Sequence, residues 1–65
     1  MIDRGTPRDQ WPELLRVEEA AALLDVSVGL VYELVRRNDL DACRLGRLVR
    51  IPRAAIIERI GGNRG

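Results

Sequence analysis

The stretch of sequence that decides the fold is ACRLGRLVRIP, Ala42 to Pro52. Apolar and basic side chains alternate on either side of a single glycine, Gly46. Alternation with a period of two residues is typical of a half-buried strand, and a glycine between two such runs is typical of a tight turn. The stretch therefore predicts a two-stranded β-hairpin that has an apolar face and a basic face.

Two registers are open to this hairpin. A two-residue turn places Arg50 among the apolar side chains of the first strand, whereas a three-residue tip, Gly46 to Leu48, pairs Arg44 with Arg50. The three-residue tip also gathers one apolar face, made of Cys43, Leu45, Val49 and Ile51. Because a slip of one residue turns every side chain to the other face, the register follows the apolar face. We predict the three-residue tip, with Arg44 and Arg50 opposed on the outward face and Arg47 at the tip.

Opposed arginines point to a polyanion. Like charges directly opposite each other in a ribbon are destabilising, and a chain of this length has little stability to spare. Phosphates on that face turn the repulsion into attraction and release counterions. The alternative is that the arginines only keep an exposed edge strand soluble.

The residues before the hairpin predict two short helices. In VEEAAALL, residues 17–24, apolar side chains recur at i, i+3, i+4 and i+7, which is the spacing of a buried helix face. A tight corner at Asp25 follows, Ser27 is a good N-cap for a second helix, and Asn38 is a good C-cap for its end. Two short helices joined by so short a corner form a helix-turn-helix unit.

The residues after the hairpin predict a third helix, starting at Pro52 and stopped by Gly61. The residues therefore predict a mainly α fold with a small β-hairpin and a helix-turn-helix unit, over residues 14–61. Residues 1–13 have no periodicity and predict a flexible N-terminal tail, and residues 62–65 predict a frayed C-terminus.

Composition excludes several classes of function. The 65 residues contain one cysteine and no histidine, so a disulfide or zinc site is not expected, and no catalytic or cofactor-binding constellation is present. No apolar run approaches a membrane span, and the first residues lack the apolar core of a secretory signal. The net charge of +1 hides an asymmetry, because residues 1–35 carry three arginines against seven acidic residues, and residues 36–65 carry eight against three. A basic half suits a polyanionic partner.

The second helix and the hairpin supply the candidate DNA-binding residues. In helix-turn-helix proteins, the N-terminal residues of the second helix meet base edges in the major groove. The candidate recognition-helix residues are Ser27, Val28, Gly29, Tyr32 and Arg36. The candidate wing residues are Arg44, Arg47 and Arg50, and further phosphate contacts are expected from Arg16, Arg37 and Arg53. Few of these side chains read bases by hydrogen bonds, and Tyr32 has the alternative role of a half-buried core aromatic.

The chain from Leu14 to Ile60 resembles the excisionase-type DNA-binding domain, which is related to the winged helix-turn-helix domain of MerR-like regulators. The resemblance is carried by V-E-E-A-A, by the D-V-S corner, by V-Y-x-L-V-R-R and by R-L-G-R-x-V-R-I-P. It implies a winged helix-turn-helix fold, with the second helix in the major groove and the hairpin as a wing in the adjacent minor groove or along its backbone. Excisionases are recombination directionality factors and are not catalysts. They bind in tandem near a phage attachment site, bend the DNA and direct an integrase toward excision.

The chain departs from this family at three places. Arg16 stands where the family carries a capping Thr or Ser, Asp25 replaces a corner glycine, and residues 28–30 are apolar or glycine instead of polar or basic. The third departure favours specificity from DNA shape and from cooperative neighbours.

The expected partners are double-stranded DNA, adjacent copies of the chain bound head to tail in a filament-like array, and an integrase or recombinase. No membrane and no small-molecule substrate are expected, and the expected location is the cytoplasm of a bacterial host cell, on DNA. One alternative is a small helix-turn-helix transcriptional regulator. A second is a protein-interaction adaptor on the same scaffold, whose apolar contacts would be Trp11, Val28, Gly29, Leu30 and Leu48.

Overall fold

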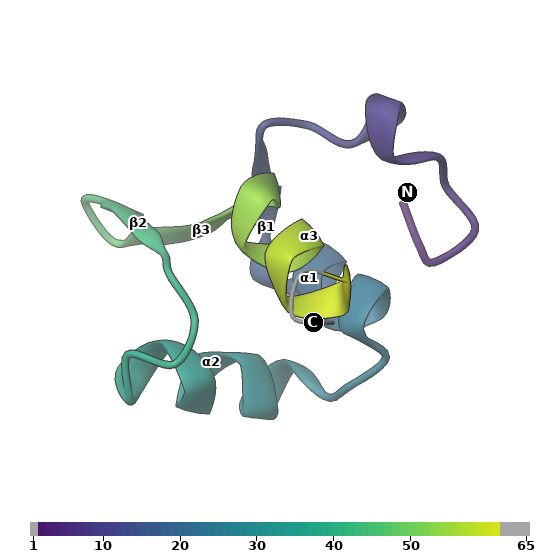
Figure 1. The fold of residues 1–65 in the computed structure, drawn as a ribbon. Helices are drawn as coiled ribbons and strands as arrows, with labels where there is room; N and C mark the ends of the chain where they lie inside the picture. Colours follow the sequence, from purple (N-terminus) through teal and green to yellow (C-terminus); the bar gives the residue numbers. More distant parts are fainter. Residues whose placement is uncertain (1, 62–65) are drawn as a thin grey trace.

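Three helices and a small antiparallel sheet make up the fold. A computed structural model describes residues 2–61 (Figure 1). The elements in chain order are a single 3-10 turn η1 (Arg8–Gln10), β1 (Leu14–Arg16), α1 (Val17–Leu24), α2 (Val28–Arg36), β2 (Cys43–Leu45), β3 (Leu48–Pro52) and α3 (Arg53–Gly61). The strand order is β1-β3-β2, with both pairs antiparallel. This arrangement confirms the predicted fold class, while the expected frayed end at residues 62–65 lies outside the described residues.

The buried face of the first helix matches the predicted face at three of its four positions. Val17, Ala20 and Ala21 are buried in α1, and the fourth buried residue is Leu23, with Leu24 only partly covered. The helix ends because Asp25 adopts a left-handed backbone, with φ of 60°. That conformation explains why a glycine suits the corner, since few other residues take a positive φ at low cost.

The second helix begins at the predicted N-cap and ends one residue earlier than predicted, because its C-cap is Arg37 and not Asn38. The Ser27 hydroxyl accepts a hydrogen bond from the backbone N–H of Leu30 at 3.1 Å, so Ser27 is the N-cap. At the other end, Asn38 has a φ of 63°, and the backbone N–H of Asp39 donates to the carbonyl of Leu34 at 2.8 Å. This pattern is a Schellman motif, which satisfies carbonyls that the helix itself leaves free. Val31 is the fully buried residue of α2.

The predicted register of the hairpin is wrong. The structure pairs Cys43 with Arg50, Arg44 with Val49 and Leu45 with Leu48. The connection is therefore a two-residue turn, in which Gly46 has a φ of 65°. Glycine with positive φ at the first central position is the pattern of a type II′ turn, whose twist matches the flanking strands.

The physical reason for the shorter turn is a third strand that the sequence analysis does not anticipate. On the other side of β3, β1 pairs Leu15 with Ile51, and both side chains are fully buried. This pair covers the apolar face of β3 without any help from β2. Leu45 is consequently free to point outward, and it is 54% exposed. The core face that the sequence analysis expected from both strands of the hairpin is instead shared between β1 and β3.

The core lies where the sheet meets the helices α1 and α3, which overlap at the β1 end of the sheet in Figure 1. Its fully or almost fully buried side chains are Trp11, Leu15, Val17, Ala20, Ala21, Leu23, Val31, Leu40, Ile51 and Ile56. Ile56 confirms the predicted inner face of α3, whereas Ile60, also predicted to be in the core, is 45% exposed. The helix starts at Arg53, one residue after the predicted Pro52.

Part of the N-terminal segment packs on this core through Trp11. The sequence analysis instead expected a flexible tail over residues 1–13. Trp11 is 5% exposed, and its indole N–H donates to the carbonyl of Thr6 at 3.0 Å. The Arg53 guanidinium donates to the Trp11 carbonyl at 2.8 Å, and the Arg53 backbone N–H donates to the Glu13 carbonyl at 2.9 Å. A large apolar side chain with a satisfied polar group holds this segment in place.

Candidate nucleic-acid interface

The start of α2 presents a surface that nothing in the described structure covers. Ser27, Val28 and Gly29 are exposed, with Val28 38% exposed. Tyr32, one turn further on, is 50% exposed and lies outside the core cluster, so its alternative role as a core aromatic is not observed. The predicted recognition residues therefore share one accessible helix face.

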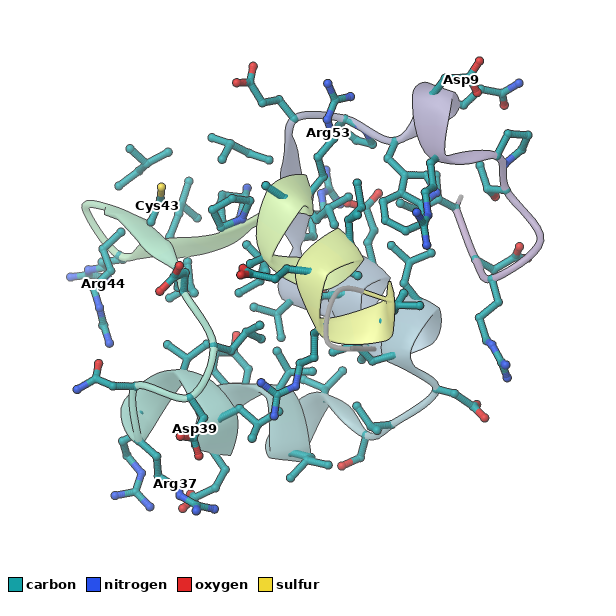
Figure 2. The ribbon with its side chains drawn as sticks, in the orientation of Figure 1. Asp9, Arg37, Asp39, Cys43, Arg44 and Arg53 are labelled. Carbon is teal, nitrogen blue, oxygen red and sulfur yellow. The ribbon has the colours of Figure 1, made fainter. Side chains whose placement is uncertain are left out.

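A groove separates α2 from the hairpin. It is lined by Gly29, Tyr32, Glu33, Val35, Arg36, Arg44 and Val49. Arg44 is in this groove because it pairs with Val49, and residues directly opposite in an antiparallel pair project to the same side. Figure 2 shows Cys43 and Arg44 leaving opposite sides of β2, with Arg44 on the side of α2. The structure thus brings one wing arginine and the recognition helix together.

Two further basic side chains lie at the same end of the molecule. Arg47 is exposed in the turn of the hairpin. Arg37 follows the last residue of α2, and its guanidinium lies 3.4 Å from the carboxylate of Asp39 (Figure 2). Across residues 2–61, Arg44 and Arg47 form no ion pair, so both retain their full capacity to meet an anion.

The other predicted wing arginine lies on the opposite face of the sheet. Arg50 pairs with Cys43 on one side and with Arg16 of β1 on the other. The arginines that oppose each other are therefore Arg16 and Arg50, and the predicted side-by-side arrangement of Arg44 and Arg50 is wrong. Arg50 is partly buried and donates to the carbonyl of Val49 at 3.1 Å. Arg50 lies on the opposite face from Arg44 because the observed register of the hairpin differs by one residue from the predicted register.

Arg53 lies away from the groove. Its side chain is partly buried, and one of its nitrogens binds the Trp11 carbonyl, near the N-terminal segment in Figure 2. Sequence reasoning also left Val35 and Val49 out of the interface. Val49 became visible as a lining residue only once its partner in β2 was known, because the pairing decides which side of the strand faces α2.

Glu33 is the acidic residue of the groove. Both of its carboxylate oxygens contact Nη2 of Arg36, at 2.6 and 2.7 Å. The spacing of three residues on a helix is the signal that predicts such a pair. The groove therefore combines one paired and one unpaired guanidinium.

Other kinds of site find no support in the part of the chain that the structure describes. Within residues 2–61, no group of three or more His, Cys, Asp or Glu side chains is placed to hold a metal ion. None of the helices in this range is long and apolar enough to cross a membrane.

Comparison with known proteins identifies the family of the chain. A family described as "Helix-turn-helix domain" matches residues 14–64. A "Probable excisionase" of Saccharopolyspora erythraea is 49% identical over 43 residues, which are 66% of this chain and 44% of that protein. A "Putative DNA-binding protein" of Mycobacterium tuberculosis is 46% identical over 44 residues, which are 68% of this chain and 56% of that protein.

The chain thus spans about half the length of the curated relatives it matches. No solved structure matches it. The family match covers both helices of the corner, the hairpin and α3, which are the elements that form the groove and hold it in place. The chain accordingly belongs to the helix-turn-helix domain family.

Proposed function

We propose that this chain binds double-stranded DNA with α2 in the major groove and the β2–β3 hairpin in the adjacent minor groove or along its backbone. The observation that carries the proposal is that Arg44 shares one groove with the exposed face of α2. A helix of this size enters the major groove, and guanidinium groups on a neighbouring ribbon neutralise phosphates. Arg47, at the tip of the same ribbon, extends the basic surface.

The phosphate contacts can be tested by the salt dependence of binding to a mixed-sequence duplex, measured by fluorescence anisotropy. If about four phosphates are engaged, the affinity of the wild type falls roughly a hundredfold between 50 and 200 mM salt. Arg44→Ala/Arg47→Ala is expected to lower the slope of log affinity against log salt by about 1.8, since two contacts are lost.

The matched control for that experiment is Arg4→Ala/Arg8→Ala, which removes the same charge from the N-terminal segment. Arg4 makes only an exposed ion pair with Asp25, at 3.2 Å, so its loss has little effect on stability. The control is expected to keep the wild-type slope. Equal slopes for both double variants would contradict the placement of the wing on the phosphates. The absence of any salt-dependent binding to the duplex would instead favour the adaptor role.

Within DNA binding, we propose the role of an excisionase: an architectural protein without catalytic activity, which bends attachment-site DNA and directs an integrase toward excision. The resemblance of residues 14–60 and the name of the Saccharopolyspora relative support this role. The proposed location is the bacterial cytoplasm, on DNA.

An assay of recombination separates an excisionase from a transcriptional regulator. A reporter flanked by attachment sites is expected to be excised by its integrase only when the chain is present, and fluorescence energy transfer between duplex ends is expected to report bending. Arg44→Ala/Arg47→Ala is expected to reduce both. Promoter-dependent changes in transcription without any excision would favour the regulator.

Copies of the chain bound in tandem would use the outer face of the sheet, defined here as Leu14, Arg16, Cys43, Leu45, Leu48, Arg50 and Pro52. Leu45 and Leu48 are 54% and 52% exposed there, and this face carries two arginines and no carboxylate. A neighbouring copy offers complementary charge, since residues 1–35 carry seven acidic residues against three arginines. Such a heterologous contact propagates along DNA.

The variant Leu45→Ser/Leu48→Ser tests this contact. It is expected to leave binding to a single short site unchanged and to abolish cooperativity on a duplex that holds several sites. A single non-cooperative isotherm for the wild type on the long duplex would contradict the proposal of tandem copies.

A further inference from the structure

Glu33 raises a question because a carboxylate is unfavourable in a groove that faces DNA. It lines the groove between α2 and the hairpin, together with Arg36 and Arg44. Its charge repels phosphates and reduces the net positive charge of the surface. The ion pair with Arg36 contributes little to stability, because its side chains are 41% and 73% exposed and an exposed pair on a helix is worth little. The benefit of Glu33 must therefore lie elsewhere.

The geometry of the pair fixes the Arg36 side chain. Both Glu33 oxygens bind the single nitrogen Nη2, at 2.6 and 2.7 Å. Within residues 2–61, Nη1 and Nε of Arg36 have no protein hydrogen-bond partner. A long side chain that is free in solution loses rotamer entropy when it binds, and a side chain already held in place loses less. Glu33 thus holds Arg36 in one orientation while part of its donor fork stays available.

The other exposed side chains of α2 are poor readers of bases. The Ser27 hydroxyl already accepts the N–H of Leu30. Val28 and Gly29 offer no side-chain hydrogen bonds, and Arg37 lies beside Asp39 beyond the last residue of α2. Tyr32, which also lines the groove, offers a single phenolic O–H, so Arg36 is the side chain on this face that offers several donors at once. An arginine presents only donors, and in the major groove guanine presents two acceptors, O6 and N7.

We infer that Arg36 reads a guanine in the major groove and that Glu33 is its positioning residue, so that the chain prefers a G·C pair at one position of its site. This inference rests on the proposed binding of DNA. It also gives Glu33 two effects of opposite sign, because its carboxylate weakens binding to any sequence and strengthens the discrimination between sequences.

The experiment compares wild type, Glu33→Gln and Arg36→Ala on duplexes from a randomised-sequence selection, followed by anisotropy titrations. The wild type is expected to prefer G·C over A·T at one position by about tenfold. Glu33→Gln is expected to bind non-specific duplex more tightly than the wild type, while its preference for G·C falls to about threefold or less. Arg36→Ala is expected to lose the preference altogether and to bind non-specific duplex more weakly.

The matched control is Glu18→Gln, which makes the same change of charge at an exposed residue of α1, outside the groove. It is expected to keep the wild-type preference for G·C. The inference is overturned if the wild type selects no G·C pair, or if Glu33→Gln discriminates as well as the wild type does. In either of these cases salt-dependent binding by the wild type still supports the proposed function, whereas the absence of that binding removes the proposed function itself.

Discussion

The two faces of the β2–β3 hairpin differ in what lies against them. The face toward α2 begins in the core at Ile51, which is fully buried, and continues through Val49 to Arg44 in the groove. The outer face has no helix against it, and Leu45 and Leu48 are about half exposed there. Both faces combine leucine, valine or isoleucine with arginine, so their composition does not distinguish them. The two faces differ in which elements pack against them.

The comparison teaches that a role can be assigned to an arginine of the hairpin only after the structure shows which face of the sheet it occupies. Arg44 and Arg50 are similar in the sequence, six residues apart and on either side of Gly46. In the structure, Arg44 lies against α2, while Arg50 lies beside Arg16 on the far side of the sheet. Opposite faces of one ribbon are therefore available for the two partners that we propose, DNA on the side of α2 and a neighbouring copy on the outer side.

The largest expected difference between the faces is in stability. Ile51→Ala removes a fully buried side chain from the core face of β3, and it is expected to lower the free energy of unfolding by about 2–5 kcal/mol. Leu48→Ala, on the outer face of the same strand, is expected to change it by less than about 0.5 kcal/mol. Urea titrations followed by circular dichroism measure both. A similar loss in the two variants would mean that the outer face is also covered in solution.

The next difference concerns the turn that joins the faces. Gly46→Ala places a side chain at a φ of 65°, and although a Cβ there has open space, the backbone strain is expected to cost about 1 kcal/mol. For a domain of this size, that loss lowers the melting temperature by about 4–8 °C. Gly29→Ala is the contrasting variant, since it lies in α2 and a Cβ would meet only ordinary contacts.

Gly29→Ala is expected to raise the free energy of unfolding by about 0.5 kcal/mol, because alanine loses less backbone entropy in a helix than glycine does. Thermal unfolding of the two variants side by side checks the opposite signs. An unchanged melting temperature for Gly46→Ala would argue against the positive φ, and with it against the two-residue turn.

The smallest expected difference is in DNA binding by single arginine variants. Arg44→Ala is expected to lower the slope of log affinity against log salt by about 0.9, which corresponds to one phosphate contact. Arg50→Ala, on the outer face, is expected to leave the slope on a single short site close to that of the wild type. Anisotropy titrations at several salt concentrations measure both slopes. A larger change for Arg50→Ala would place the outer face against DNA.

Several features of the fold follow from local sequence. The corner of the helix-turn-helix is predictable because Asp25 and Ser27 act on their immediate neighbours, one through its left-handed backbone and the other through its hydroxyl. The hairpin and its glycine are predictable because strand alternation and turn chemistry extend over only a few residues. The exposed face of α2, which holds the candidate recognition residues, follows from the spacing of its buried and exposed positions.

The tertiary structure alone decided the register of the wing, and therefore which arginine faces α2. The sequence analysis assigned the apolar face to the two strands of the hairpin, because they are adjacent in the chain. The strand that completes that face is β1, which lies far from its partner β3 in the chain. Its three residues show too short a pattern to predict.

Once Leu15 covers Ile51, Leu45 no longer needs the core, and the two-residue turn that glycine favours can form. The sequence by itself thus determined the three helices, the hairpin, the N-cap Ser27 and the supply of arginines, because these depend on neighbours in the chain. The direction of each arginine depended on contacts between distant segments, since a one-residue change in pairing reverses the face of every side chain.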